Sequence, residues 1–324
     1  MARIGFGMAV PHSGMLGKPA ETWLEDGARD RRNPALWFRQ KSWTYAELEA
    51  ERRHEGFAPL LSIDERRMRA DRCADALNTM RQFYAANKPD VAVIIGKDQK
   101  EIFIETTPSL AVYTGAEIVN GPPQRSVYAP DHPAVHPGHP ELANHIIKAL
   151  AADDFDLADI ARWPANTWMR GKPIVPHAYG FIYHQIMGDD VPPNVPVFMN
   201  TFYPPNQPSM ARSIAFGKAL LSAIKSWDSD QTVAIIASGG LSHFVCDEDL
   251  DRTFIDLMGA YDFDGLAALD DRNYQSGNSE LKLYVPVLAA MADSAAKMTL
   301  VDYVPCYRTE AGTGEGMGFM YWAA

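Results

Sequence analysis

Short apolar runs alternate along the chain with segments in which apolar residues recur at every third or fourth position. Four runs are almost wholly apolar and stop at glycine, proline or polar residues, which is typical of buried strands: 4–10, 91–95, 195–199 and 233–237. Five segments carry a helical apolar stripe instead: 64–87, 141–152, 210–224, 248–259 and 281–296. Strands that alternate with amphipathic helices predict an α/β fold with a largely parallel central sheet flanked by helices.

Residues 1–324 are predicted to form one domain, because the chain contains no internal repeat and no linker rich in glycine or serine. Residues from about 17 to 63 lack a sustained period and are interpreted as a loop-rich insertion with a short helix near 45–53. Residues from about 305 to 324 are interpreted as a glycine-rich tail that crosses close to other backbone. We expect the aromatic residues of the insertion to cover a pocket or to form the contact of a homodimer: Trp23, Trp37, Phe38 and Trp43.

Charge and cysteine content narrow the class of protein. The chain has 30 Lys and Arg residues against 41 Asp and Glu residues, and the net charge of −11 argues against nucleic acid or an anionic membrane as a partner. No apolar stretch reaches the roughly 18 residues that cross a bilayer, and the N-terminus lacks a secretory signal pattern. The 3 scattered cysteines exclude a disulfide framework and suggest a reducing compartment, so we expect a soluble cytoplasmic protein.

Polar side chains follow three of the predicted strands at the point where each strand ends. His12 follows the first strand, Asp98 and Gln99 the second, and His243 the fourth, while Glu280 begins a predicted helix. Singly, each has an ordinary explanation as a loop residue or as a carboxylate at a helix N-terminus. Ligands gather at the carboxyl ends of parallel strands, however, and imidazole and carboxylate are common ligands of divalent transition metals. We therefore expect the active site at this edge of the sheet.

The segments that hold these residues resemble the successive motifs of the class III extradiol ring-cleavage dioxygenases, the superfamily of the protocatechuate 4,5-dioxygenase catalytic subunit. The motifs follow in the same order and at similar spacing over nearly the whole chain: Pro-His-Ser-Gly at 11–14, Asp-Val-Ala-Val-Ile-Ile-Gly-Lys-Asp-Gln at 90–99, Gly-Gly-Leu-Ser-His at 239–243 and Ser-Gly-Asn-Ser-Glu at 276–280. The Gly-Gly-Leu-Ser-His segment is the most specific of them.

The resemblance implies a mononuclear non-haem Fe(II) centre that acts on a small catecholic or dihydroxylated aromatic compound and incorporates both atoms of O2. His12 then corresponds to the first iron ligand and Glu280 to the carboxylate ligand. His243 corresponds to the active-site acid and base that takes a proton from a substrate hydroxyl. His177 corresponds to a second pocket histidine that contacts the substrate or the oxygen.

The second strand carries a departure from the family pattern. Where the family commonly has Asn-Asp-His, this chain has Lys97-Asp98-Gln99, so it resembles a subgroup with Asp-Gln in place of Asp-His. A neutral amide oxygen is a weaker donor to Fe(II) than an imidazole nitrogen. Three outcomes stay open: Gln99 is the third ligand of a loosely held iron, His54 completes the site, or the protein is a metal-poor or non-oxygenase member of the fold, such as a lyase, a hydrolase or a redox-interaction protein. Asp98 is interpreted as a residue that orients a ligand.

Other histidines and basic residues are assigned smaller roles. His132, His136 and His139 have metal-like spacing, but the prolines among them prevent a helix from stacking the rings, so a solvated loop is the preferred interpretation. An anionic substrate would need local positive charge in so acidic a protein. We expect that charge from the metal and from residues such as Lys97 or Arg308.

Overall fold

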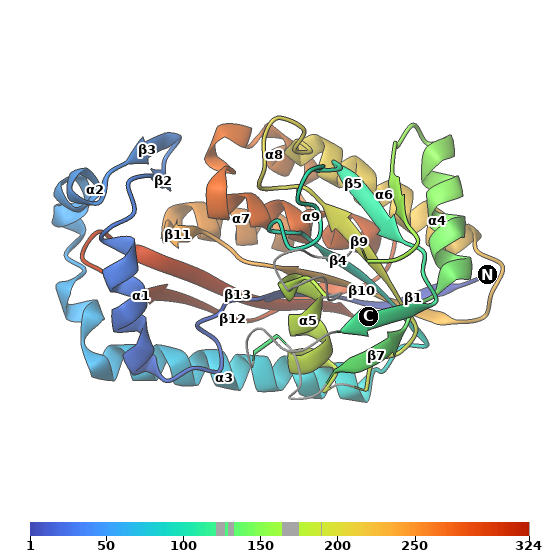
Figure 1. The fold of residues 1–324 in the computed structure, drawn as a ribbon, viewed down its shortest axis with the longest axis horizontal. Coiled ribbons are helices and arrows are strands. Elements are labelled where there is room, and N and C mark those ends of the chain that lie inside the picture. The colour runs from blue at the N-terminus through green and yellow to red at the C-terminus, as the bar shows by residue number, and fades with distance from the viewer. Residues whose placement is uncertain (121–126, 129–132, 164–174, 189, 324) are drawn as a thin grey trace.

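A nine-stranded mixed sheet lies at the centre of the computed structural model, which describes residues 1–120, 127–128, 133–163, 175–188 and 190–323. Its order is β11-β13-β1-β10-β4-β9-β5-β8, with β12 paired to β13 (Figure 1). The strands are β1 (Arg3–Pro11), β4 (Val91–Gly96), β5 (Leu110–Tyr113), β8 (Ala158–Ile160), β9 (Asn194–Met199), β10 (Thr232–Gly239), β11 (His243–Val245), β12 (Lys297–Tyr307) and β13 (Thr313–Ala323).

Four adjacent parallel strands in the middle of this sheet are the four that the apolar runs predict. β1 pairs with β10, β10 with β4, and β4 with β9, all in parallel. Pro11 lies opposite Gly239, and Ile95 lies opposite Ala237, so β1, β10 and β4 end at nearly the same level. The residues that follow these three strands therefore lie at one edge of the sheet.

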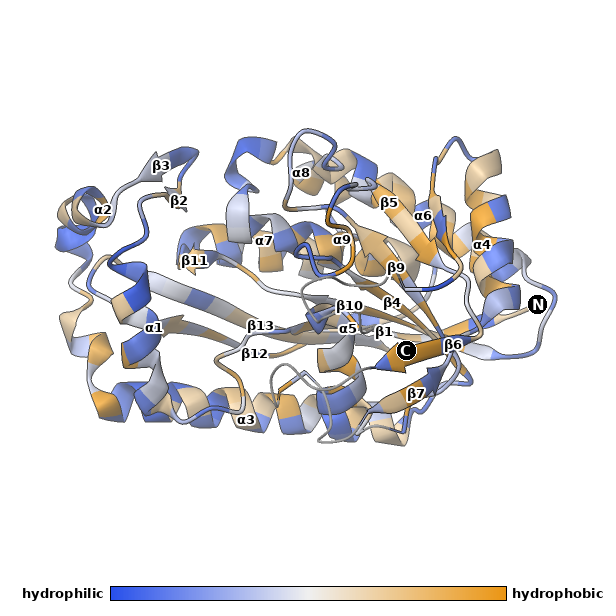
Figure 2. Ribbon diagram, viewed as in Figure 1, coloured by the Kyte–Doolittle hydropathy of each residue, from blue (hydrophilic) through white to orange (hydrophobic). Residues whose placement is uncertain are grey.

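Helices cover both faces of the sheet and give each face its own apolar core. One face carries α4 (Pro140–Ala152), α6 (Met210–Ser226), α7 (Glu248–Gly259), α8 (Phe263–Ala268) and α9 (Leu281–Met291), and the other carries α3 (Ile63–Ala86) and α5 (His177–Phe181) with the π-helical turn η4 (Ile182–Ile186) (Figure 1). Val93 and Ile95 of β4 belong to the first core, whereas Ala92 and Ile94 belong to the second. Burial on both faces explains the unbroken apolar runs, which are the orange central strands of Figure 2.

The predicted helices are confirmed, and polar caps explain several of their ends. The Ser209 hydroxyl accepts a hydrogen bond from the backbone N–H of Arg212 at 3.1 Å, which caps α6 as the sequence predicts. α9 ends at Met291, earlier than predicted. Within the described residues, none of the helices is long and apolar enough to cross a membrane.

The glycine-rich segment near 305–324 is part of the sheet, which the sequence analysis did not predict. β12 and β13 form an antiparallel hairpin, and β13 also pairs with β1 and β11. Gly314 has a φ of +154°, and a Cβ atom there would overlap the carbonyl oxygen of Cys306. A Cβ atom at Gly316 would overlap the carboxylate of Asp251. The glycines therefore permit close approaches, as expected, and they also hide the alternating pattern of a strand.

The insertion at about 17–63 is more regular than predicted. The expected short helix is α2 (Tyr45–Arg52), and it is accompanied by η1 (Ala20–Thr22), α1 (Trp23–Asp30), the hairpin of β2 (Leu36–Phe38) and β3 (Lys41–Trp43), η2 (Arg53–Glu55) and η3 (Ala58–Leu61). The buried Arg52 donates to the carbonyl oxygens of Cys246 at 2.9 Å and Ala311 at 3.4 Å, which ties the insertion to the β11 and β13 region. Trp23 and Phe38 are buried inside the chain itself.

Two of the three clustered histidines have separate structural roles, and His132 lies outside the described residues. His136 is buried in β7 (Ala134–Pro137), which pairs with β6 (Glu117–Asn120), and its ring lies 4.7 Å from that of Tyr183. The His139 ring accepts a hydrogen bond from the Leu142 N–H at 3.1 Å and caps α4. The solvated-loop interpretation is wrong for His136, because a four-residue strand among prolines leaves little sequence pattern, whereas His139 lies outside that strand and is half-buried.

A substitution at Gly217 of α6 tests the close packing of this helix against α9. A Cβ atom at Gly217 would lie 2.5 Å from the carbonyl oxygen of Pro286 and 2.7 Å from Ala289 Cβ. Gly217→Val should therefore lower the free energy of unfolding by about 1–3 kcal/mol through overpacking, as measured by urea denaturation. Ala215→Ser, at an exposed position of the same helix, is the control and should change it by less than about 0.5 kcal/mol. An unchanged stability for Gly217→Val would contradict the close approach of the two helices.

Candidate functional site

A buried glutamate forms the centre of a group of ionisable side chains at the carboxyl ends of β1, β4 and β10. Glu280, the last residue of η6 (Ser276–Glu280), is 2% exposed. Its Oε2 lies 3.3 Å from His12 Nε2, its Oε1 lies 3.2 Å from His243 Nε2, and the ammonium of Lys97 contacts the same Oε1. We call these four residues the Glu280 cluster. The structure thus brings together three of the predicted site residues and adds Lys97.

The structure around β1 fixes which nitrogen of His12 faces Glu280. The backbone N–H of His12 donates to the carbonyl oxygen of Gly239 at 2.8 Å, and ring Nδ1 lies 3.1 Å from Ser238 Oγ. The Ser238 hydroxyl donates its own proton to the carbonyl oxygen of Ala178 at 2.6 Å, so Ser238 Oγ accepts the Nδ1 proton of His12. Burial lowers the pKa of His12 to about 4. The ring is therefore neutral at pH 7, and Nε2 is the ring nitrogen that faces Glu280.

His243 is held at the start of β11 with the same orientation toward Glu280. Its backbone N–H donates to Asn278 Oδ1 at 2.9 Å, and its ring Nδ1 donates to the carbonyl oxygen of Leu241 at 2.8 Å. Burial alone would lower the pKa of His243, but the neighbouring Glu280 carboxylate outweighs burial and raises it. His243 is therefore the histidine of the cluster better suited to hold a proton at neutral pH.

Lys97 and Glu280 form a buried ion pair. Lys97 is 1% exposed, and its Nζ also lies 4.7 Å from the centroid of the Phe202 ring. Burial alone would raise the pKa of Glu280, but the positive charge of Lys97 and the two histidines lower it well below its usual value. The carboxylate is therefore ionised. Because removing either charge from water is costly, each of the two groups depends on the other.

His177 lies at the edge of the cluster, and Glu101 orients it. The His177 backbone N–H donates to Glu101 Oε1 at 3.0 Å, and ring Nδ1 lies 2.8 Å from Oε2. The His177 ring meets that of His12 edge to face, with centroids 4.6 Å apart and an interplanar angle of 87°. Burial alone would raise the pKa of Glu101, but His177 lowers it. Sequence reasoning found His177 and missed Glu101, although Glu101 follows the second strand by only a few residues.

Gln99 and Asp98 belong to the turn after β4. Gln99 is half-buried, and within the described residues its carboxamide makes no hydrogen bond to a cluster side chain. The Asp98 carboxylate accepts the backbone N–H groups of residues 101, 102 and 103 at 3.0, 2.9 and 3.2 Å. Asp98 therefore stabilises the turn. The sequence predicts that it orients a metal ligand, but these three bonds all go to backbone N–H groups.

Two residues suggested from elsewhere in the chain are engaged outside the cluster. His54 is exposed in η2, and its ring Nδ1 lies 3.0 Å from the carbonyl oxygen of Glu51. The structure does not place it with His12. Arg308 donates to both carboxylate oxygens of Asp30, at 2.8 and 3.3 Å, in a largely buried pair. Of the two basic residues expected to provide positive charge, Lys97 is the one at the cluster.

Asp251 of α7, which the sequence analysis missed, secures the segment that carries His243. Its Oδ1 accepts the backbone N–H of Ser242 at 2.7 Å, and its Oδ2 accepts the hydroxyls of Ser242 and Tyr303, each at 2.7 Å. Burial raises the pKa of Asp251 to about 7. A signal was present in the sequence, because Asp251 shares a helical spacing with apolar residues 254, 255 and 258 and therefore lies on the buried face.

The cluster does not fit a divalent metal held by the predicted ligands. Within the described ranges, no group of three or more His, Cys, Asp or Glu side chains is arranged to hold a metal ion. His12 and Glu280 lie together, and the ammonium of Lys97 contacts the carboxylate of Glu280. An ammonium has no lone pair to offer a metal. The carboxylate of the predicted set of His12, Gln99 and Glu280 is thus already paired with Lys97, and the assignment of Gln99 as a ligand stays a prediction.

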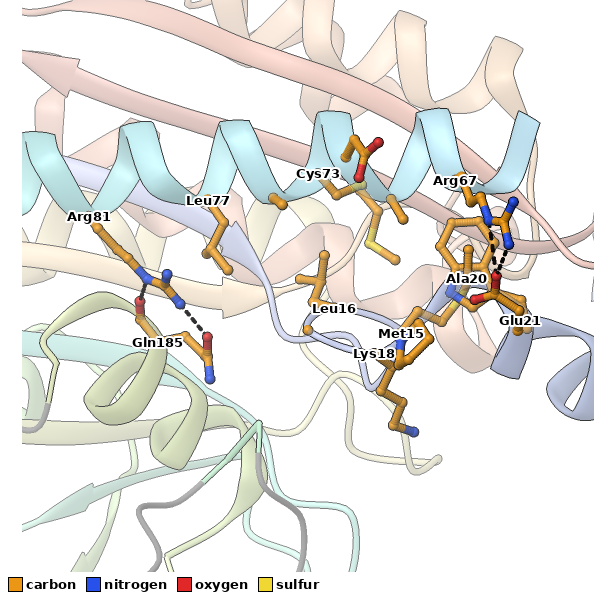
Figure 3. Close-up of a pocket in the computed structure, with 17 residues that line it drawn as sticks. Met15, Leu16, Lys18, Ala20, Glu21, Arg67, Cys73, Leu77, Arg81 and Gln185 are labelled. Atoms are coloured by element: carbon orange, nitrogen blue, oxygen red, sulfur yellow. Dashed lines mark hydrogen bonds and ion pairs between the residues drawn. The ribbon is translucent and has the colours of Figure 1, made fainter. Parts of the chain in front are cut away.

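A separate cavity of about 400 Å³ lies between α3 and the segment that follows β1 (Figure 3). Met15, Leu16 and Leu77 contribute apolar walls, and Arg67 donates to Glu21 at 2.6 Å across one side. The lining of this cavity includes none of the four residues of the Glu280 cluster. The predicted chemistry therefore belongs to the cluster and not to this cavity.

Comparison with known proteins shows which family model, which relative and which solved structure this chain matches. The model of the family described as the catalytic LigB subunit of aromatic ring-opening dioxygenase matches residues 58–313. Gallate dioxygenase of Pseudomonas putida is 32% identical over 130 residues, which cover 37% of this chain and 35% of that protein, so the match spans about a third of the relative's length. A solved structure of an uncharacterized protein from Escherichia coli K12 aligns with a TM-score of 0.44 and 14% identity, over 76% of this chain and 91% of that one.

Glu280→Gln tests the mutual dependence of the buried ion pair. Removing this charge leaves the Lys97 ammonium buried without a counter-ion, so the variant should lose about 3–5 kcal/mol of unfolding free energy in urea denaturation. The double variant Lys97→Met/Glu280→Gln should recover part of that loss. Asp293→Asn is the matched control, because Asp293 pairs with Lys225 at 3.4 Å on the surface and should contribute less than about 1 kcal/mol. Equal losses for Glu280→Gln and Asp293→Asn would contradict this description of the pair.

Asp251→Asn tests the buried carboxyl behind His243 through its pH dependence. The pKa of Asp251 in the folded chain is about 7, above the ordinary value, so the group stabilises the fold at low pH and this contribution is lost as the pH rises to 7. Asparagine does not titrate. The unfolding free energy of the variant relative to wild type should therefore rise between about pH 4 and 7, by up to about 1.4 kcal/mol per unit. The control Asp249→Asn, at an exposed position of α7, should give a flat difference. If the difference in unfolding free energy between Asp251→Asn and wild type does not change with pH, the raised pKa of Asp251 is wrong.

Proposed function

Because the chain belongs to the family of the catalytic LigB subunit of aromatic ring-opening dioxygenases, we propose that it opens the ring of a small dihydroxylated aromatic compound with O2, in the extradiol position, at the Glu280 cluster. The observation that carries the proposal is the convergence of His12, His243 and Lys97 on one buried carboxylate at the carboxyl ends of three adjacent strands. The matched region contains His177, His243, Glu280 and Lys97, and His12 precedes it.

His243 is the residue that we assign to proton transfer. Ring opening of a dihydroxylated aromatic compound begins with loss of a hydroxyl proton, which raises the electron density of the ring. The Nδ1 of His243 is committed to the Leu241 carbonyl, so Nε2 is the atom that accepts and returns the proton. Glu280 stabilises the imidazolium form while the proton is held. His177, fixed by Glu101, contributes a second imidazole beside His12.

The resemblance implies Fe(II) as the cofactor, with His12, Gln99 and Glu280 as its ligands, but the Lys97 ammonium on Glu280 does not fit a metal held by these residues. The assignment of Gln99 as the third ligand stays a prediction, and no step of the proposed proton transfer depends on iron. A second candidate function is a metal-independent member of the same fold, such as a lyase or a hydrolase. The ion pair between Lys97 and Glu280 favours this alternative, because it already neutralises the carboxylate.

We propose small molecules as the partners of this protein, with O2 and an aromatic compound as substrates. The net charge of −11 supports the expectation that it binds neither nucleic acid nor an anionic membrane surface. A cytoplasmic location and a homodimeric state are also proposed, on the cysteine content and on the aromatic insertion. Trp37 and Trp43 of this insertion are half-buried and are the residues that a partner subunit could cover.

Oxygen consumption tests the proposed function. Protein is loaded anaerobically with Fe(II), or treated with a chelator, and then given O2 and a panel of catechols. We expect O2 uptake and a yellow ring-opened product in at least one of the two samples. His243→Gln should lower kcat by about 10²–10⁴-fold, because the proton acceptor is lost. His145→Gln is the control, since the His145 ring bonds the C-terminal turn of α6. Absence of O2 uptake in both samples across the panel would contradict a ring-opening dioxygenase.

A further inference from the structure

The ammonium of Lys97 is buried and only partly engaged. Its side chain is 1% exposed, and Glu280 is its ion-pair partner. Within the described residues, no oxygen accepts from Lys97 Nζ in full hydrogen-bond geometry. An ammonium has three N–H donors, and a buried donor without an acceptor is costly. The cluster therefore keeps positive hydrogen-bond donors available for a ligand.

An aromatic ring borders this ammonium, and further rings lie around His12. Phe202 lies 4.7 Å from Lys97 Nζ, measured to the ring centroid. The rings of His12 and His177 stand edge to face beside the cluster, and the Tyr128 hydroxyl donates to the His12 carbonyl oxygen at 3.2 Å. A buried cation among aromatic side chains suits a flat ring that carries a negatively charged oxygen.

The same ion pair argues against a divalent cation. Oε1 of Glu280 already contacts Lys97 and His243, and Oε2 lies 3.3 Å from His12 Nε2. A metal bound between His12 and Glu280 would have to displace the ammonium or lie beside it as a like charge. The positive charge that the carboxylate requires is supplied by the chain itself.

We propose that Lys97 replaces the metal as the cation of this site: the wild-type chain binds the monoanion of a dihydroxylated aromatic compound through the Lys97 ammonium and holds no divalent metal between His12 and Glu280. The substrate class in this inference rests on the proposed function. The absence of metal and the role of Lys97 rest on the geometry of the cluster.

Metal binding is tested with Co(II), whose absorption bands report its coordination. After anaerobic dialysis against Co(II), wild-type protein should show no bands from a protein-bound ion. Lys97→Met/Gln99→His should bind about one Co(II) per chain, because the first change frees Glu280 and the second supplies an imidazole. One Co(II) per wild-type chain, lost in His12→Ala, would overturn the proposal.

Ligand binding is tested with 3,4-dihydroxybenzoate under anaerobic conditions, by tryptophan fluorescence with and without a chelator. Wild-type affinity should be the same in both, and Lys97→Met should weaken binding about tenfold or more, because a charge-assisted hydrogen bond is lost. Lys100→Met is the matched control, since the Lys100 ammonium lies 4.8 Å from the Tyr203 ring, and it should stay within about twofold of wild type. Binding by Lys97→Met within about twofold of wild type would contradict the proposal.

A neutral version of the pair covers the case in which Lys97→Met does not fold. Lys97→Met/Glu280→Gln leaves no unpaired buried charge, and we expect the same loss of 3,4-dihydroxybenzoate binding. Retained binding by this double variant would also overturn the proposal. Ring opening that requires iron bound to the wild-type chain would overturn this inference and preserve the proposed function. Binding of 3,4-dihydroxybenzoate that resists the chelator, without O2 uptake, would support this inference and contradict the proposed function.

Discussion

A lysine and a glutamate that are both withdrawn from water hold the centre of this site together. Lys97 is 1% exposed and Glu280 is 2% exposed, so neither charge has solvent to stabilise it. Because burying two unpaired charges is costly, the ammonium and the carboxylate must pair. The fold allows this by placing the end of β4 against η6. The positions of His12 and His243 then follow, because both present Nε2 to the same carboxylate.

The parallel sheet explains why these groups come from distant parts of the chain. β1, β10 and β4 are neighbours in space and end at one level, so the residues after them share one edge. Each imidazole is then oriented by an oxygen at its Nδ1, from Ser238 for His12 and from Leu241 for His243. The result is a proton-holding histidine beside a buried cation, an arrangement suited to an acidic aromatic hydroxyl.

Much of this architecture could be predicted from the sequence, and what could not has physical reasons. The central strands were recognisable because burial on both faces makes them apolar throughout, whereas β13 was hidden by glycines that allow close packing. His12, His243 and Glu280 were found because they follow strands or begin a helix within recognisable motifs. Glu101 and Asp251 were missed because their roles depend on tertiary partners, and the position of Lys97 on Glu280 could not be read from spacing.

The cation that neutralises Glu280 distinguishes an internal lysine from a bound metal. The most direct measurement is an anaerobic crystal structure of wild-type protein grown with Fe(II) and 3,4-dihydroxybenzoate, with anomalous diffraction recorded at the iron edge. The account predicts a ligand oxygen about 3 Å from Lys97 Nζ and no anomalous peak between His12 and Glu280. An iron peak that bridges these two residues, with the Lys97 ammonium displaced from the carboxylate, would contradict it.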